Sequence, residues 1–132
     1  MKGLACLLLT LAVGAGPGSA PTPLSGVYRV GAAGLFDLVT RDGAVVGTFR
    51  SGGECGYQAN LPVITGHLEG SVLVGSMLLC QEGPGCPAQR TVPFLALRRG
   101  EQLMGLVKLE RGCGSPALAD RRLLFRPATP EE

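Results

Sequence analysis

Hydrophobic and polar positions alternate along several short stretches of this chain. Val45, Gly47 and Phe49 fall on one face of an extended segment, and residues 102–110 and 122–126 alternate in the same way. A period of two is typical of β-strands that have one buried face and one wet face. No stretch shows a helical period with capping residues at its ends. The pattern therefore predicts an all-β protein.

Glycine-containing turns divide these stretches into pairs. Asp42-Gly43, Glu69-Gly70 and Arg99-Gly100 each separate two apolar runs, and glycine tolerates the positive φ that tight hairpin turns require. An internal echo, DGAVVGTF, EGSVLVGSM and RGEQLMGLV, recurs about every 28 residues, a spacing that fits one hairpin plus one longer connection. We expect eight strands, at residues 26–31, 34–41, 44–50, 57–68, 71–80, 90–98, 102–110 and 119–126.

Eight short strands in sequence order predict a small antiparallel up-and-down β-barrel. The alternative is a two-sheet β-sandwich, although the Cys…Trp…Cys pattern of immunoglobulin domains is absent because the chain has no tryptophan. Connections in such a meander alternate between the two ends. We therefore expect the tight turns at one end and the longer connections, residues 51–56, 81–89 and 111–118, at the other.

The first residues read as a secretory signal peptide. Lys2 precedes a short apolar run over residues 4–13, which small residues follow up to Ala20. Cleavage after Ala20 is one expectation. Cleavage after Ala15 is the other, because Pro21 makes the bond after Ala20 a poor peptidase substrate. We expect a secreted or periplasmic protein whose mature chain has no transmembrane segment.

The domain organisation that follows is a signal peptide at 1–20, a flexible lead at 21–25, one barrel domain at 26–127 and a polar tail at 128–132. The formal net charge is only +2, and the chain contains two tyrosines. Scattered arginines without stacking aromatic residues are not typical of a nucleic-acid-binding face. We expect a monomer that takes no cofactor and binds no nucleic acid.

Four cysteines remain once Cys6 is lost with the signal peptide, and in an oxidising compartment they predict two disulfides. A hairpin turn near residue 100 pairs residues whose numbers add to about 200, which favours Cys86–Cys113. The turn near residue 70 favours Cys55–Cys80 in the same way. The alternative is Cys80–Cys86 with Cys55–Cys113. The spacing lacks the closely spaced cysteine pairs of zinc sites, so we expect no metal.

Three features of the sequence each admit a chemical interpretation. The only histidine, His67, lies near the tight turns, far from the cysteines and loop serines, so no nucleophile and base come together and we expect no enzyme. Glu54 and Glu82 could be neighbours, but the aromatic platforms of a sugar groove are missing. The repeated glycines, Gly47, Gly75 and Gly105, either shape the barrel or clear space for a small apolar ligand.

The cysteine-bearing loops are the candidate working surface, because cross-linked loops lose little entropy when a partner binds. The sequence predicts a non-catalytic binding module for another secreted or surface protein, one form of which would be an inhibitor of a secreted hydrolase. The alternatives are a carrier of a small apolar ligand inside the barrel and a structural envelope protein. The predicted partner-binding residues are Glu54, Tyr57, Gln58, Glu82, Gln89, Arg90, Arg111 and Ser115.

The general plan resembles two kinds of small secreted barrel. The hairpin rhythm of glycine, apolar residue and second glycine resembles that of avidin-like barrels, but their ligand cage depends on tryptophan, so the resemblance does not imply biotin binding. Size, signal peptide, barrel and disulfides resemble the barrel-type inhibitors of proteases or lysozymes from bacterial periplasms. No motif carries over residue by residue, and no family is assigned from the sequence.

Overall fold

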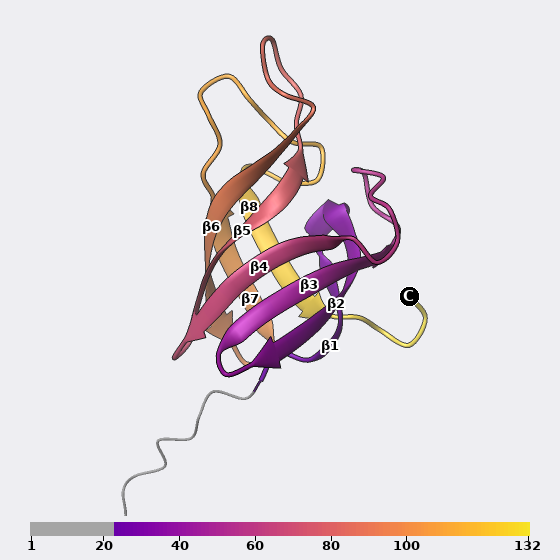
Figure 1. The fold of residues 1–132 in the computed structure, drawn as a ribbon, viewed down its shortest axis with the longest axis vertical. Coiled ribbons are helices and arrows are strands. Elements are labelled where there is room, and N and C mark those ends of the chain that lie inside the picture. Colours follow the sequence, from indigo (N-terminus) through magenta and orange to yellow (C-terminus); the bar gives the residue numbers. More distant parts are fainter. Residues whose placement is uncertain (1–22) are drawn as a thin grey trace, which may run out of the picture.

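Eight antiparallel strands close into a barrel in which each strand pairs with its neighbours in the chain and β8 pairs with β1 (Figure 1). The predicted up-and-down barrel is thus confirmed. This computed structural model describes residues 23–132; the expected signal peptide, its cleavage site and Cys6 lie outside the described residues. The elements are β1 (Gly26–Val30), the 3-10 turn η1 (Gly31–Ala33), β2 (Gly34–Arg41), β3 (Ala44–Ser51), β4 (Pro62–Glu69), β5 (Val72–Cys80), β6 (Gln89–Arg99), β7 (Gln102–Val107) and β8 (Arg122–Pro127).

Two strands begin later than the sequence pattern predicts, β4 at Pro62 and β8 at Arg122. Before β4 the chain bends at Asn60, whose φ is +66°, and the amide of Asn60 donates to the carbonyl oxygen of Phe49 (2.8 Å). Before β8, Asp120 and Arg121 also have positive φ. Left-handed residues end regular pairing, so apolar residues in these segments do not continue a strand.

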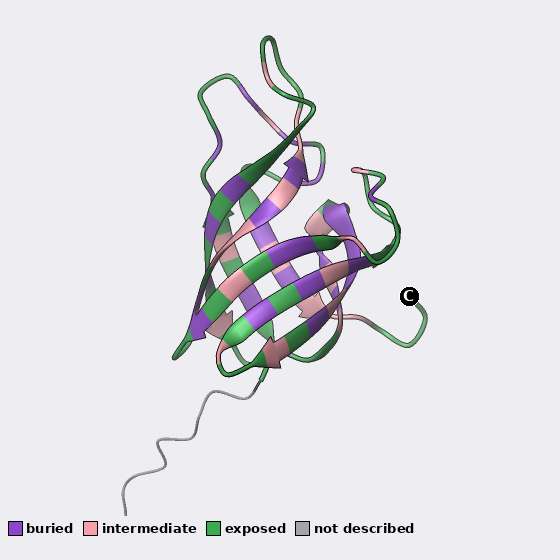
Figure 2. Ribbon diagram, viewed as in Figure 1, coloured by how far each residue is buried: buried purple, intermediate pink, exposed green. Residues whose placement is uncertain are grey.

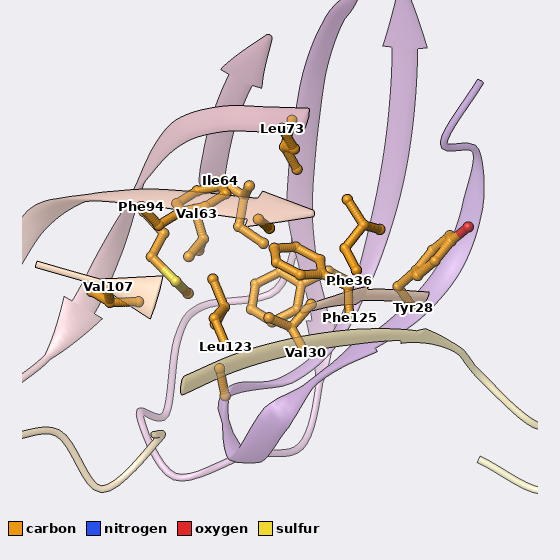
Figure 3. Packing of buried hydrophobic residues seen from close by; sticks show 14 of the residues in the cluster. Tyr28, Val30, Phe36, Val63, Ile64, Leu73, Phe94, Val107, Leu123 and Phe125 are labelled. Carbon is orange, nitrogen blue, oxygen red and sulfur yellow. The ribbon is translucent and has the colours of Figure 1, made fainter. Parts of the chain in front are cut away.

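Side chains that point into the barrel form one hydrophobic cluster (Figures 2 and 3). Phe36 packs edge-on against Phe49, with ring centroids 5.6 Å apart, and Phe94 packs against Phe125 at 5.8 Å. Leu24 belongs to the same cluster and is fully buried, although it lies in the segment expected to be a flexible lead. The ordered domain therefore begins before residue 26, because this apolar side chain packs against the core.

Glycines on the inner face let neighbouring strands approach closely. A Cβ added to Gly75 would lie 2.3 Å from the carbonyl oxygen of Thr65, and one added to Gly105 would lie 2.0 Å from that of Leu95. At Gly47 the Cβ would meet Leu38 and Ile64, both at 2.9 Å. The space beside these glycines is therefore filled by protein atoms. This favours their role in shaping a small barrel over clearance for a ligand.

The β1–β8 seam closes the barrel through three register pairs, one of which places Arg29 opposite Arg126. Like charges in directly opposed positions destabilise a sheet. The side-chain carboxylate of Glu132 accepts hydrogen bonds from both arginines and from the amide of Thr129 (3.0 Å). The hydrogen bonds from Arg126, Thr129 and Arg29 hold the pKa of Glu132 well below its ordinary range. The polar tail thus bridges the seam.

We expect Gly105→Ala to destabilise the barrel by about 3 kcal/mol, because the new methyl group must push β6 and β7 apart. Gly114→Ala is the matched control, since a Cβ there meets nothing within 4 Å. Urea unfolding of the disulfide-intact proteins measures the difference. Equal unfolding midpoints for the two variants would show that the strands separate without cost.

We expect Glu132→Gln to lower the melting temperature at neutral pH, whereas Glu131→Gln, which changes the neighbouring exposed residue, leaves it unchanged. A carboxyl group whose pKa is lowered in the folded state stabilises the protein above its unfolded-state pKa, and this contribution is lost as the pH falls. The difference between Glu132→Gln and the wild type should therefore shrink below about pH 4. Melting curves across this pH range check it, and a difference that grows in acid would contradict the bridge.

Candidate functional site

Four connections gather at one end of the barrel, which we call the loop end. They are η1 and residues 52–61, 81–88 and 108–121, and the tight turns between the other hairpin strands lie at the opposite end (Figure 1). The loops 81–88 and 108–121 project beyond the strands at the top of the view. This is the arrangement that the alternation of short and long connections predicts.

The two predicted disulfides, Cys55–Cys80 and Cys86–Cys113, are both present, with Cα atoms 5.3 and 5.8 Å apart. Cys55 and Cys80 are partly buried against the hydrophobic cluster, and the amide of Cys80 donates to the Cys55 sulfur. In a chain-entropy account, a cross-link across a loop of this length stabilises the fold by about 3 kcal/mol. The disulfides are compatible with an extracellular or periplasmic setting.

The two projecting loops are joined by backbone hydrogen bonds in addition to the Cys86–Cys113 disulfide. Glu82 and Gly114 form an isolated antiparallel bridge, in which each amide donates to the other's carbonyl oxygen at 2.9 Å. A Cβ at Gly83 would lie 2.4 Å from the carbonyl oxygen of Gly112, so the loops approach as closely as glycine allows. The two loops therefore form one cross-linked extension of the barrel.

Ala32, in η1, links the remaining connections. Its amide donates to the carbonyl oxygen of Ala117 (3.2 Å), and its carbonyl oxygen accepts from the amide of Glu54 (2.8 Å). These bonds join η1 to the loops 108–121 and 52–61. With the two disulfides and the Glu82–Gly114 bridge, they tie all four connections together.

Six of the eight predicted partner-binding residues are exposed at or beside the loop end, namely Glu54, Gln58, Glu82, Gln89, Arg90 and Arg111. They do not form a single group. Glu54 and Gln58 lie on the loop 52–61, whereas the other four lie on or next to the two projecting loops. A partner that contacted all six would have to span the loop end.

Tyr57 and Ser115 are not presented to a partner, because both side chains are buried. The Tyr57 hydroxyl donates to the carbonyl oxygen of Leu78 (2.5 Å), and its ring packs edge-on against Phe49 with centroids 5.2 Å apart. The Ser115 hydroxyl accepts from the amide of Ala117 (3.2 Å). The sequence predicted that Tyr57 and Ser115 bind a partner because both are polar residues in loops. Instead, both side chains form contacts within the loop end.

Sequence reasoning missed two features of the projecting loops. Glu110 forms an ion pair with the predicted residue Arg90, and their numbers add to about 200, so the register of the β6–β7 hairpin could have found the pair. A hollow of about 220 Å³ lies between the loops, bordered by the charged residues Glu82, Asp120 and Arg121. No sequence signal marks this hollow, since a disulfide and a backbone bridge create it.

The loop end presents exposed polar side chains with charges of both signs. Within residues 23–132, no three His, Cys, Asp or Glu side chains are placed to hold a metal ion. His67 lies on β4 beside Gly43, next to a tight turn and away from the loop end. In the same part of the chain, every cysteine is disulfide-bonded. The exposed polar residues of the loop end make it a candidate contact surface for another molecule.

Comparison with protein-family models, with curated proteins and with solved structures gave no significant match. The resemblance to avidin-like barrels and to barrel-type inhibitors therefore stays one of general plan. No helix in the described part of the chain has the length and the apolar character that a membrane span requires.

Burial raises the pKa of Tyr57 to about 12. We expect a Tyr28→Phe variant, which leaves Tyr57 as the only tyrosine, to form tyrosinate with a midpoint near pH 12 when folded and near pH 10 when reduced and unfolded. Because the folded-state pKa is raised, the stability that Tyr57 contributes is complete below about pH 10 and is lost as the pH rises through about 12.

Tyrosinate absorbance measures this titration directly. Tyr57→Phe is the matched control, because the remaining signal then reports Tyr28 alone. A midpoint near pH 10 in the folded Tyr28→Phe variant would mean that the Tyr57 hydroxyl is in contact with solvent.

Proposed function

We propose that this protein is a non-catalytic binding module that binds another secreted or surface protein through its loop end. The single observation that carries the proposal is the cross-linking of four separate connections by two disulfides, the Glu82–Gly114 bridge and the hydrogen bonds of Ala32. Loops held in one arrangement before binding have little conformational entropy to lose. Because strand pairing already closes the barrel, we interpret the additional cross-links at one end as serving recognition.

The distribution of polar groups supports the same function. The six exposed predicted residues carry charges of both signs, and amide side chains add donors and acceptors. Backbone groups, and not these side chains, hold the connections together. The side chains can therefore contact a partner without loss of the loop structure, with the exception of the ion pair between Arg90 and Glu110.

Inhibition of a secreted hydrolase is the form of binding that the shape favours. The loop 81–88 projects from the barrel (Figure 1), carries Pro84 and Pro87, and is closed at its base by the bridge to Gly114. A narrow, cross-linked projection can enter an active-site cleft at low entropic cost. Transport of a small apolar ligand has less support, because inward side chains pack together and the inner glycines abut neighbouring strands.

A photo-crosslinking residue placed at Arg111 tests the proposal. We expect the disulfide-intact protein to form one dominant adduct with a protein of the secreted fraction of its source cells, identified by mass spectrometry. The matched control carries the same residue at Asp42, an exposed residue in the β2–β3 turn at the opposite end of the barrel. If the captured protein is a hydrolase, the purified barrel should inhibit it.

The control separates two outcomes. Adduct formation from position 111 and not from position 42 supports binding through the loop end. An adduct from position 42 alone, or equal adducts from both positions, would overturn the loop end as the binding surface.

A further inference from the structure

The outer face of β5 to β8 carries two adjacent rows of apolar side chains. Strand register places the apolar residues Val72, Leu97, Met104 and Leu124 in one row and Val74, Leu95 and Leu106 in the next, which ends on β8 at Arg122. We call these seven residues the sidewall patch. Val74, Leu95, Leu97, Met104 and Leu106 are 45–64% exposed and are the most exposed members. Water-facing positions of a half-buried sheet normally carry polar side chains.

The core does not account for these side chains, because they point away from the barrel interior. Together they expose on the order of 500 Å² of apolar surface, near the upper end of what single-chain soluble proteins show. A shallow groove of about 280 Å³ runs between β6 and β7, lined by Pro93, Leu95 and Leu106 among others. The loop end lies elsewhere, so the proposed function does not use this surface either.

We propose that the sidewall patch is the interface between two copies of this chain. A two-fold interface uses the same surface of both copies and must therefore be complementary to itself. The four most central residues, Leu95, Leu97, Met104 and Leu106, form two cross-strand pairs without a charge among them, and the nearest outward charges, Arg99 and Arg122, lie at the edges of the patch. The centre of the patch can therefore face its own copy without burying a charge. Two such patches bury about 1,000 Å² of apolar surface, close to the lower bound of about 1,200 Å² for specific, stable interfaces.

The distribution of charge at the two ends of β7 favours one orientation: Lys108 and Arg122 make one end positive, whereas Glu101 beside Arg99 leaves the other end close to neutral. Glu101 lies in the turn before β7, and Lys108 directly follows its last residue. A two-fold axis perpendicular to β7 places the strands of the two copies antiparallel, so that Lys108 of each copy approaches the Glu101 end of the other. A parallel arrangement would bring the two Lys108 ammonium groups toward each other, which is unfavourable. In the antiparallel dimer the two loop ends lie at opposite ends, and Lys108 is the loop-end residue that approaches the other copy.

Sedimentation velocity of the disulfide-intact protein tests the interface. We expect the wild type to sediment as a dimer at micromolar concentrations and Leu106→Glu to sediment as a folded monomer, with a dissociation constant at least 100-fold weaker. Val46→Glu is the matched control, because Val46 is an exposed apolar residue on β3, outside the patch. Circular dichroism confirms that both variants fold.

A charge exchange tests the orientation. Glu101→Lys and Lys108→Glu should each weaken the dimer, and the double variant should recover most of the affinity. A wild type that stays monomeric up to about 100 µM would overturn the proposal, as would equal weakening by Leu106→Glu and Val46→Glu. Binding of that monomer to phosphatidylglycerol vesicles would assign the patch to a lipid surface. Failure of the double variant to recover would overturn the antiparallel arrangement.

Discussion

The closed ladder of backbone hydrogen bonds is the constraint on which the rest of this structure depends. Once β8 pairs with β1, every strand has two partners and no sheet edge is left open. Closure also fixes which side chains face inward, because a slip of one residue would turn a whole strand inside out. The positions of the loop end and of the sidewall patch both follow from this one register.

Much of the fold could be predicted from local sequence signals. Alternation around Val45 and Phe49 identifies the buried face, glycine turns mark the hairpins, and hairpin register identifies both disulfides. These signals suffice because a meander pairs only consecutive strands, apart from the single closing pair β1–β8. Each local pairing then places its neighbours, and few alternatives remain.

The parts that sequence reasoning missed depend on contacts between distant segments. Tyr57 is buried because its loop folds back over the barrel mouth, where Phe36 and Phe49 already lie. Leu24 is buried, and its carbonyl oxygen accepts a hydrogen bond from the Thr40 hydroxyl (2.6 Å). A loop tyrosine and a leucine in a Gly/Pro-rich lead carry no pattern that reveals such packing. The outward positions of Met104 and Leu106 follow from alternation, but their shared surface with Leu95 appears only once the strands are paired.

The loop end and the sidewall patch differ in which interactions maintain them and in which groups they expose. At the loop end, disulfides and backbone hydrogen bonds carry the structure, so exposed side chains such as Gln58 and Arg111 are not needed to maintain it. Their chemistry can change without destabilising the barrel. On the sidewall, every strand is paired with its neighbours in the sheet, and apolar side chains are in contact with water. One barrel can therefore bind a partner through polar residues at its loop end and associate with a second copy through its apolar sidewall patch, because the two surfaces use different interactions.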